Sequence, residues 1–145
     1  MRLTVYTDYA LRLLMYVAQR PDRLCTIAEV AQAYRVSEAH LMKITHHLGR
    51  GGFLETVRGK GGGMRLAMAP SEINIGTLVR QMETDIDLVE CFETGNNACQ
   101  IMPACVLRGA LHQALGAFLA VLDKYTLADL LRPKAELSRL LTPSA

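Results

Sequence analysis

Apolar residues recur at helical spacing near the start of the chain. Thr7 and Asp8 are both able to cap a helix, and Leu11, Leu14 and further apolar positions follow at intervals of three to four residues. Pro21 lies beyond the last of these positions, where a helix does not continue. The pattern predicts a first helix that begins at Thr7 or Asp8 and ends before Pro21.

Two shorter helices follow, joined by a tight turn. Thr26 is a helix cap with Glu29 three positions later, the spacing of a capping box, and this helix extends to about Tyr34. Ser37 caps a third helix that extends to about Leu48, where a run of glycines ends it. Two short helices separated by a turn of three to four residues are typical of a helix-turn-helix motif.

A β-hairpin is expected directly after these helices. Residues 53–58 and 64–67 have strand character and flank a glycine-rich turn over residues 59–63. Three consecutive glycines, with Gly62 in the middle, let the backbone approach a phosphate chain closely and adopt positive φ. An ordinary hairpin with a solvated tip is the alternative. Because the hairpin follows a helix pair and has a basic tip, we interpret it as the wing of a DNA-binding domain.

The second half of the chain predicts a different organisation. A short helix over residues 75–82 precedes an acidic, non-periodic stretch, and a long helix over residues 104–125 carries a broad apolar face with many alanines. That helix either packs internally or pairs with its copy in a dimer. Short helices at 127–131 and 135–141 cover the core. The predicted fold class is mainly α with a small β-hairpin: a winged helix-turn-helix domain (1–82), a cluster-binding loop (83–104), and a dimerisation helix with a C-terminal tail (105–145).

Charge separates the two halves of the 145-residue chain. Its formal net charge is +2, but residues 1–80 carry eleven basic and six acidic side chains, whereas residues 81–145 carry five and eight. A basic first half indicates a polyanionic partner. Asp8 and Arg12 interrupt the apolar residues of the N-terminal stretch, so we expect it to be neither a signal peptide nor a membrane span. No apolar run reaches the roughly 20 residues that a bilayer requires, and we expect a cytoplasmic protein without a membrane partner. It also lacks a phosphate-binding loop, a nucleophile–base pair and a paired-carboxylate motif, and we predict that it is not an enzyme.

The predicted DNA contacts lie in two groups. The first group occupies the opening turns of the third helix, the end that contacts bases or flanking phosphates in such motifs. The second group surrounds the wing turn, where cations can neutralise phosphates or enter a minor groove. The candidates are Ser37, Glu38, His40 and Lys43 in the helix, and Arg58, Lys60, Gly62 and Arg65 in the wing.

Three cysteines lie within fifteen residues of the irregular stretch. Cys91, Cys99 and Cys105 follow the pattern C-x7-C-x5-C, and the third stands at the start of the long helix, where a thiolate is favoured. Three soft ligands on one loop suit an iron–sulfur cluster or zinc, and a redox thiol switch or plain packing are the alternatives. Cys25 stands alone and is expected to be a buried small apolar residue. His112 lies two helical turns after Cys105, roughly 10 Å away by helix rise, which is far for a ligand of the same ion.

Several motifs together resemble a known family. The V-R-G-K-G-G-G wing at residues 57–63 is accompanied by four other segments, at residues 1–4, 7–11, 103–105 and 125–130. Over almost its whole length the chain resembles the iron–sulfur winged-helix regulators of the IscR type. The segments around Cys105 and over 125–130 are similar to the nitric-oxide-sensitive repressors of that family.

The resemblance implies a homodimer that binds double-stranded promoter DNA and carries a cluster on the three clustered cysteines. It implies a fourth ligand from the first helix of the other subunit, and we expect Asp8 to be that ligand. His112, by analogy with the nitrogen ligand of IscR-type members, is the alternative. We favour a 4Fe–4S over a 2Fe–2S cluster. The expected function is a repressor that releases DNA when nitric oxide attacks the cluster; a reporter of iron–sulfur supply, or a thiol or metal protein without a DNA-binding role, are the alternatives.

Overall fold

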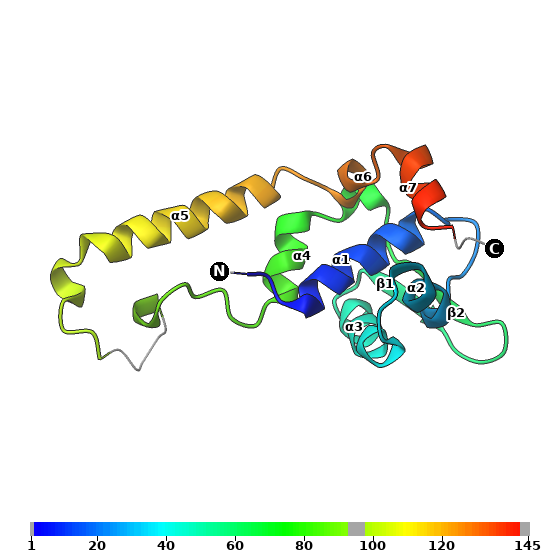
Figure 1. Ribbon diagram of the computed structural model, residues 1–145, viewed down its shortest axis with the longest axis horizontal. Helices are drawn as coiled ribbons and strands as arrows, with labels where there is room; N and C mark the ends of the chain where they lie inside the picture. The colour runs from blue at the N-terminus through cyan, green and yellow to red at the C-terminus, as the bar shows by residue number, and fades with distance from the viewer. Residues whose placement is uncertain (1, 93–97, 143–145) are drawn as a thin grey trace.

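The computed structural model describes residues 2–92 and 98–142 and is mainly helical, with one two-stranded antiparallel sheet (Figure 1). The predicted fold class is confirmed. In chain order the elements are α1 (Val5–Ala18), α2 (Ile27–Tyr34), α3 (Glu38–Arg50), β1 (Leu54–Val57), β2 (Gly63–Leu66), the 3-10 turn η1 (Pro70–Glu72), α4 (Ile75–Met82), the 3-10 turns η2 (Glu90–Phe92) and η3 (Met102–Ala104), α5 (Val106–Leu122), α6 (Leu127–Leu130) and α7 (Lys134–Leu140).

The core forms around α1, which packs against α2, α3, α4, α6 and β2. Its inward face includes Ala10, Leu13 and Leu14, all fully buried. The predicted cap of this helix is wrong. Thr4 is the N-cap, and its hydroxyl accepts a hydrogen bond from the Thr7 backbone N–H at 3.3 Å. Thr7 is itself buried within the first turn, so the helix begins three or four residues earlier than expected.

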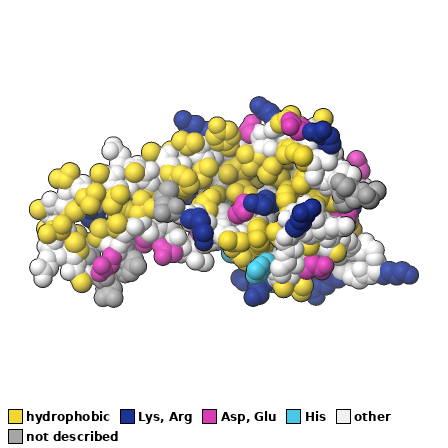
Figure 2. Space-filling view, in the orientation of Figure 1, with side chains coloured by type: hydrophobic (Ala, Val, Ile, Leu, Met, Phe, Trp, Pro, Cys, Tyr) yellow, Lys and Arg dark blue, Asp and Glu magenta, His cyan; other side chains and the backbone are white. Residues whose placement is uncertain are grey.

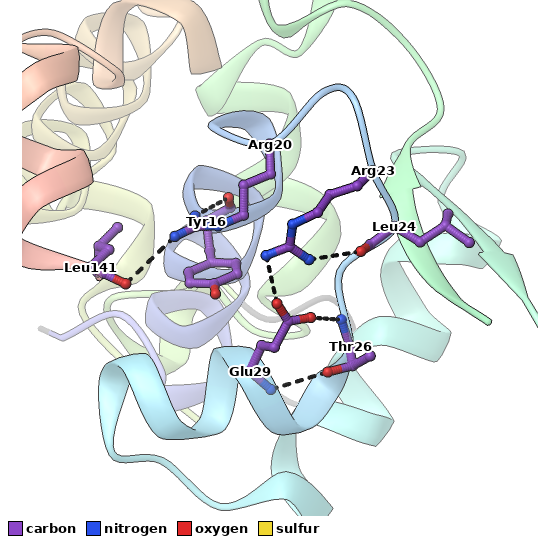
Figure 3. A network of polar contacts seen from close by, with 7 residues as sticks. All are labelled: Tyr16, Arg20, Arg23, Leu24, Thr26, Glu29 and Leu141. Carbon is purple, nitrogen blue, oxygen red and sulfur yellow. Dashed lines mark hydrogen bonds and ion pairs between the residues drawn. The ribbon is translucent and has the colours of Figure 1, made fainter. Parts of the chain in front are cut away.

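The N-terminus of α2 is fixed by contacts to the segment that follows α1 (Figure 3). The capping box at Thr26 is present as predicted: its hydroxyl accepts from the Glu29 N–H, and the Glu29 carboxylate accepts from the Thr26 N–H at 2.7 Å. Arg23 donates to the same carboxylate at 2.6 Å and, as the principal cause, lowers the pKa of Glu29. Arg35, with φ of 55°, then reverses the chain into α3. The contacts at Thr26 therefore fix where α2 begins, and the left-handed residue Arg35 marks where it ends.

The hairpin is paired in one register, with Leu54 opposite Leu66 and Val57 opposite Gly63. Cys25 adds a third backbone segment, because it exchanges two hydrogen bonds with Met64, of 2.9 and 2.8 Å. The Cys25 side chain is fully buried, as expected of a small apolar residue. The base of the hairpin is therefore joined to the helical body, while its tip extends away from it (Figure 1).

The long helix α5 extends outward from the rest of the molecule, and none of its residues is buried (Figure 1). Its C-terminal end is attached to α4, since Arg80 forms two hydrogen bonds of 2.6 and 2.8 Å with Asp123. Gly76 permits this attachment, because a Cβ there would overlap the Asp123 carboxylate. Figure 2 shows apolar side chains along the projecting helix. In the part of the chain that the structure describes, no helix is long and apolar enough to cross a bilayer.

Candidate DNA interface and metal centre

The candidate recognition surface is the exposed side of α3. Leu41, Ile44 and Leu48 face the core, which leaves the predicted contacts Glu38, His40 and Lys43 on the outside, together with His46 and Arg50. Ser37 occupies the N-cap position, but its side chain forms no capping hydrogen bond. Its hydroxyl is therefore available to a ligand.

Two aromatic contacts join α1 to α3. The ring centroids of Tyr9 and His40 are 6.4 Å apart, and those of Tyr6 and His47 are 6.0 Å apart. His40 thus has a neighbour in α1 as well as a position on the outer surface. The orientation of α3 consequently depends on the position of α1.

The wing carries three predicted cations in two different situations. Arg65 donates to Glu55 on the opposite strand at 2.8 Å, so its charge is already partnered. Arg58 and Lys60 lie at the exposed tip, and among the described residues neither forms an ion pair with a carboxylate. The tip therefore presents two cations to solvent.

The glycines of the wing have different structural reasons. Gly59 and Gly61 adopt φ of 95° and 76°, as a tight turn requires. Gly62 does not have positive φ; a Cβ there would lie 2.2 Å from the Val57 carbonyl oxygen. A Cβ at Gly63 would lie 2.6 Å from the Cys25 carbonyl oxygen. The expectation that the glycine run serves positive φ is thus correct at Gly61, whereas its other two members are needed for close backbone packing.

The candidate metal centre lies at the outer end of α5. Cys91, Cys99 and Cys105 are all partly buried, and the four cysteines of the chain form no disulfide. Cys105 is the N-cap of α5, and its sulfur accepts a hydrogen bond from the Arg108 N–H at 3.4 Å. The Arg108 side chain reaches back and donates from Nε to the Cys91 carbonyl oxygen at 3.3 Å. One arginine thus joins two cysteines that lie fourteen positions apart.

A cavity of about 600 Å³ opens beside Cys105 and is also lined by Arg108 and His112. The His112 ring contacts Phe92, the residue after Cys91, with centroids 5.8 Å apart. Within the described residues, however, no three His, Cys, Asp or Glu side chains are close enough to hold a metal ion. Residues 93–97, between Cys91 and Cys99, lie outside the described part of the chain. The donor set still fits a cluster chemically: three thiols, one at a helix N-terminus, beside a cation that favours thiolates.

Asp8 lies on α1 with its side chain 46% exposed. Both of its carboxylate oxygens accept hydrogen bonds from Arg12, at 3.0 and 2.8 Å. Among the described residues, Asp8 belongs to no group of three or more potential metal ligands, and its role as a ligand supplied to another subunit stays a prediction.

Comparison with known proteins assigns the chain to a family. The profile of Rrf2, described as an iron-dependent transcriptional regulator, matches residues 3–133. The chain belongs to the Rrf2 family. It is 51% identical over 142 residues to the HTH-type transcriptional regulator NsrR of Bacillus subtilis strain 168, covering 97% of both chains. A putative transcriptional regulator from Listeria innocua is similar in structure, with a TM-score of 0.74, 30% identity, and coverage of 92% of this chain and 88% of the other.

Another solved structure, that of T. potens IscR, shares the fold at 20% identity, with a TM-score of 0.72 over all of this chain and 94% of the other. These likenesses confirm the predicted resemblance, including the winged-helix fold. This Rrf2-family chain is a transcriptional regulator of the NsrR type, and the prediction that it is not an enzyme is confirmed.

Sequence reasoning missed three features of this Rrf2-family chain. His46 and Arg50 lie on the same exposed face of α3 as Lys43. They follow Lys43 by three and seven residues, a helical spacing that could have identified them as further candidates for DNA contact. Arg108 has no such signal, because its contact to Cys91 depends on the fold. Glu83 is only 8% exposed and accepts hydrogen bonds from the Thr4 N–H and hydroxyl, of 2.7 and 3.1 Å. It ties the start of the cysteine-bearing segment to the N-terminus of α1.

Proposed function

We propose that this Rrf2-family regulator is a homodimeric repressor with an iron–sulfur cluster on Cys91, Cys99 and Cys105, and that it releases promoter DNA in response to nitric oxide. The observation that carries the proposal is the placement of Cys105 at the N-cap of a helix, connected to Cys91 through Arg108. The family's description as iron-dependent supports a metal of this kind. The motifs shared with nitric-oxide-sensitive repressors support the signal.

The residues of the centre have distinct roles in this proposal. The N-terminus of α5 would favour the negative charge of a thiolate-ligated cluster at Cys105, because the N–H groups and the dipole of a helix start attract anions. Arg108 holds the Cys91 backbone near that thiolate and adds a positive charge. A bound cluster, which we propose to be 4Fe–4S, would supply iron able to react with nitric oxide. The division into residues 1–82, 83–104 and 105–145 then separates DNA binding, sensing and dimerisation.

The fourth ligand is proposed to be the partner subunit's Asp8. An exposed carboxylate can be reached by a second subunit, and a hard oxygen ligand on iron is weak and displaceable. Binding it would require the pair between Asp8 and Arg12 to open. His112 of the same subunit supports a second candidate function, a reporter of iron–sulfur supply, because it lines the cavity beside Cys105.

The projecting helix supports the dimer. Val106, Leu107 and Val121 are 86%, 64% and 52% exposed, which is unfavourable for apolar side chains on one helix unless a partner covers them. Pairing of α5 with its copy would bury them. It would also join two copies of α3, which an operator with two half-sites about one helical turn apart requires.

Anaerobic purification followed by iron and sulfide analysis tests the proposal. We expect a coloured protein with 4Fe–4S stoichiometry, an absorption spectrum that changes with nitric oxide, and a gel shift on promoter DNA that is lost after the gas is added. Cys105→Ser should abolish the colour, whereas Cys25→Ala removes a thiol outside the centre and should retain it. A colourless protein that contains zinc alone would contradict the proposal.

Asp8→Ala and His112→Ala distinguish the two candidate functions. If the partner's Asp8 is the ligand, its removal changes the spectrum and accelerates cluster loss, while His112→Ala leaves both unchanged. The reverse result would favour the reporter of iron–sulfur supply.

A further inference from the structure

A groove of about 710 Å³ lies beside α3, between the start of α1 and the end of α4. We name it the α3 groove. Tyr6 forms its α1 side, and Gln81 and Met82 form its α4 side. The α3 side carries four side chains that can bear positive charge, and no acidic side chain lines the groove. These four are Lys43, His46, His47 and Arg50.

The cations of the α3 groove have no carboxylate partner in the described part of the subunit. Lys43, His46 and Arg50 are exposed, and none of them forms an ion pair with a carboxylate among the residues that the structure describes. The nearby Glu83 is buried and already accepts hydrogen bonds from Thr4. Such a concave basic surface attracts an anion.

The position of the α3 groove relates it to the wing. Figure 1 shows the hairpin on one side of α3 and α4 on the other. A helix that lies in the major groove of DNA has a sugar–phosphate backbone on each side, because that groove is only about 12 Å wide. The wing can contact one backbone, and the α3 groove faces the other.

We propose that the α3 groove binds a backbone phosphodiester of the DNA through Arg50 and His46, two residues that the predicted set of DNA contacts does not include. The inference rests on the proposed DNA-binding function and deepens it. Arg50 carries only donors, which match the acceptor oxygens of a phosphate, and it lies at the C-terminal end of α3 beside α4, away from the opening turns that contact base edges. The guanidinium of Arg50 can contact two phosphate oxygens at once. The contact positions the regulator on DNA without reading sequence.

Salt titration of DNA binding tests the site. The anaerobically purified full-length chain is titrated with two duplexes of about three helical turns, one selected from a random library and one of random sequence. Arg50→Ala should reduce the slope of log K against log salt by about 0.9 on both duplexes, with about tenfold weaker binding. Adding His46→Ala should weaken both further by a similar factor. Lys124→Ala removes an exposed cation that follows α5 and is not part of the groove lining, and it should leave the slope unchanged.

Two outcomes would overturn this inference while the proposed function stands. One is selective DNA binding by Arg50→Ala with the parent's slope and affinity. The other is a shift of the monomer–dimer equilibrium in Arg50→Ala without a change in slope, which would assign the α3 groove to a second copy of the chain. If the parent itself binds neither duplex, the proposed function fails and this inference fails with it.

Discussion

Gly62→Ala should disable the wing while the helical body stays folded. An added Cβ would lie 2.2 Å from the Val57 carbonyl oxygen and 2.9 Å from the Gly59 carbonyl oxygen, and contacts under 3.0 Å force a shift. The backbone must therefore move by about 0.8 Å to restore a 3.0 Å contact. This is the point where the Gly62 N–H closes the turn with a 3.0 Å hydrogen bond to the Gly59 carbonyl oxygen. Overpacking of this kind costs about 1–3 kcal/mol, which exceeds what the exposed tip can recover from its own contacts.

The base of the hairpin should survive this change. Leu54 and Met64 are 4% and 1% exposed, and Met64 is bonded to Cys25 through its backbone. The loss is then confined to the tip, which presents Arg58 and Lys60. If both cations contact phosphates, the salt slope of DNA binding should fall by about 1.8.

Fluorescence anisotropy of labelled promoter DNA across a salt series measures this loss, and circular dichroism measures the fold. Lys60→Ala is the matched comparison, because it removes one cation without altering the turn and should reduce the slope by about 0.9. Binding by Gly62→Ala with the parent's affinity and slope would show that the wing tip does not contact phosphate.

Three further predictions concern the metal centre, the dimer and pH. Arg108→Ala should speed loss of iron to a chelator about 10- to 100-fold, because Cys91 is no longer held near the helix N-terminus, whereas Arg108→Lys keeps the charge and should recover part of the stability. Leu107→Glu, at a 64% exposed position of α5, should leave the subunit folded but shift sedimentation from dimer to monomer. Glu29→Gln should lower the free energy of unfolding at pH 7 by about 0.5–1 kcal/mol. Because Arg23 lowers the pKa of Glu29 in the folded state, that stabilisation is present above the ordinary glutamate pKa and is lost as pH falls through the lowered value, so urea titrations of parent and variant should converge in acid.

The spacing of apolar residues predicted the helices that surround the core well, because each of them buries one face and that face sets the pattern of apolar positions. The helix over 75–82 is observed as Ile75–Met82, and the capping box at Thr26 is present. The start of α1 was harder to predict, since Thr4, Thr7 and Asp8 are all good caps. Burial of Thr7 against the core decides for Thr4, and that burial cannot be read from three polar residues within five positions of the sequence.

The candidate site was predictable only where it is local in sequence. The wing and the opening of α3 follow from short motifs. Arg108 and Glu83 have contacts that span 17 and 79 positions, so no local pattern identifies them. The requirement for glycine at position 62 was also not predictable. It arises because the folded turn brings the Val57 carbonyl oxygen against this position, whereas the residue type alone indicates only freedom of φ.

The first helix connects the proposed sensor to the DNA-reading surface. Asp8 lies between Tyr6 and Tyr9, whose rings contact His47 and His40 of α3. The N-terminus of the same helix is held by Glu83, at the start of the cysteine-bearing segment. If the partner's cluster takes Asp8 as a ligand, the bond fixes α1, and the two ring contacts pass that constraint to α3. Loss of the bond then changes the spacing of two recognition helices, and because half-sites lie at a fixed separation, a small rotation of each α3 is enough to release the operator.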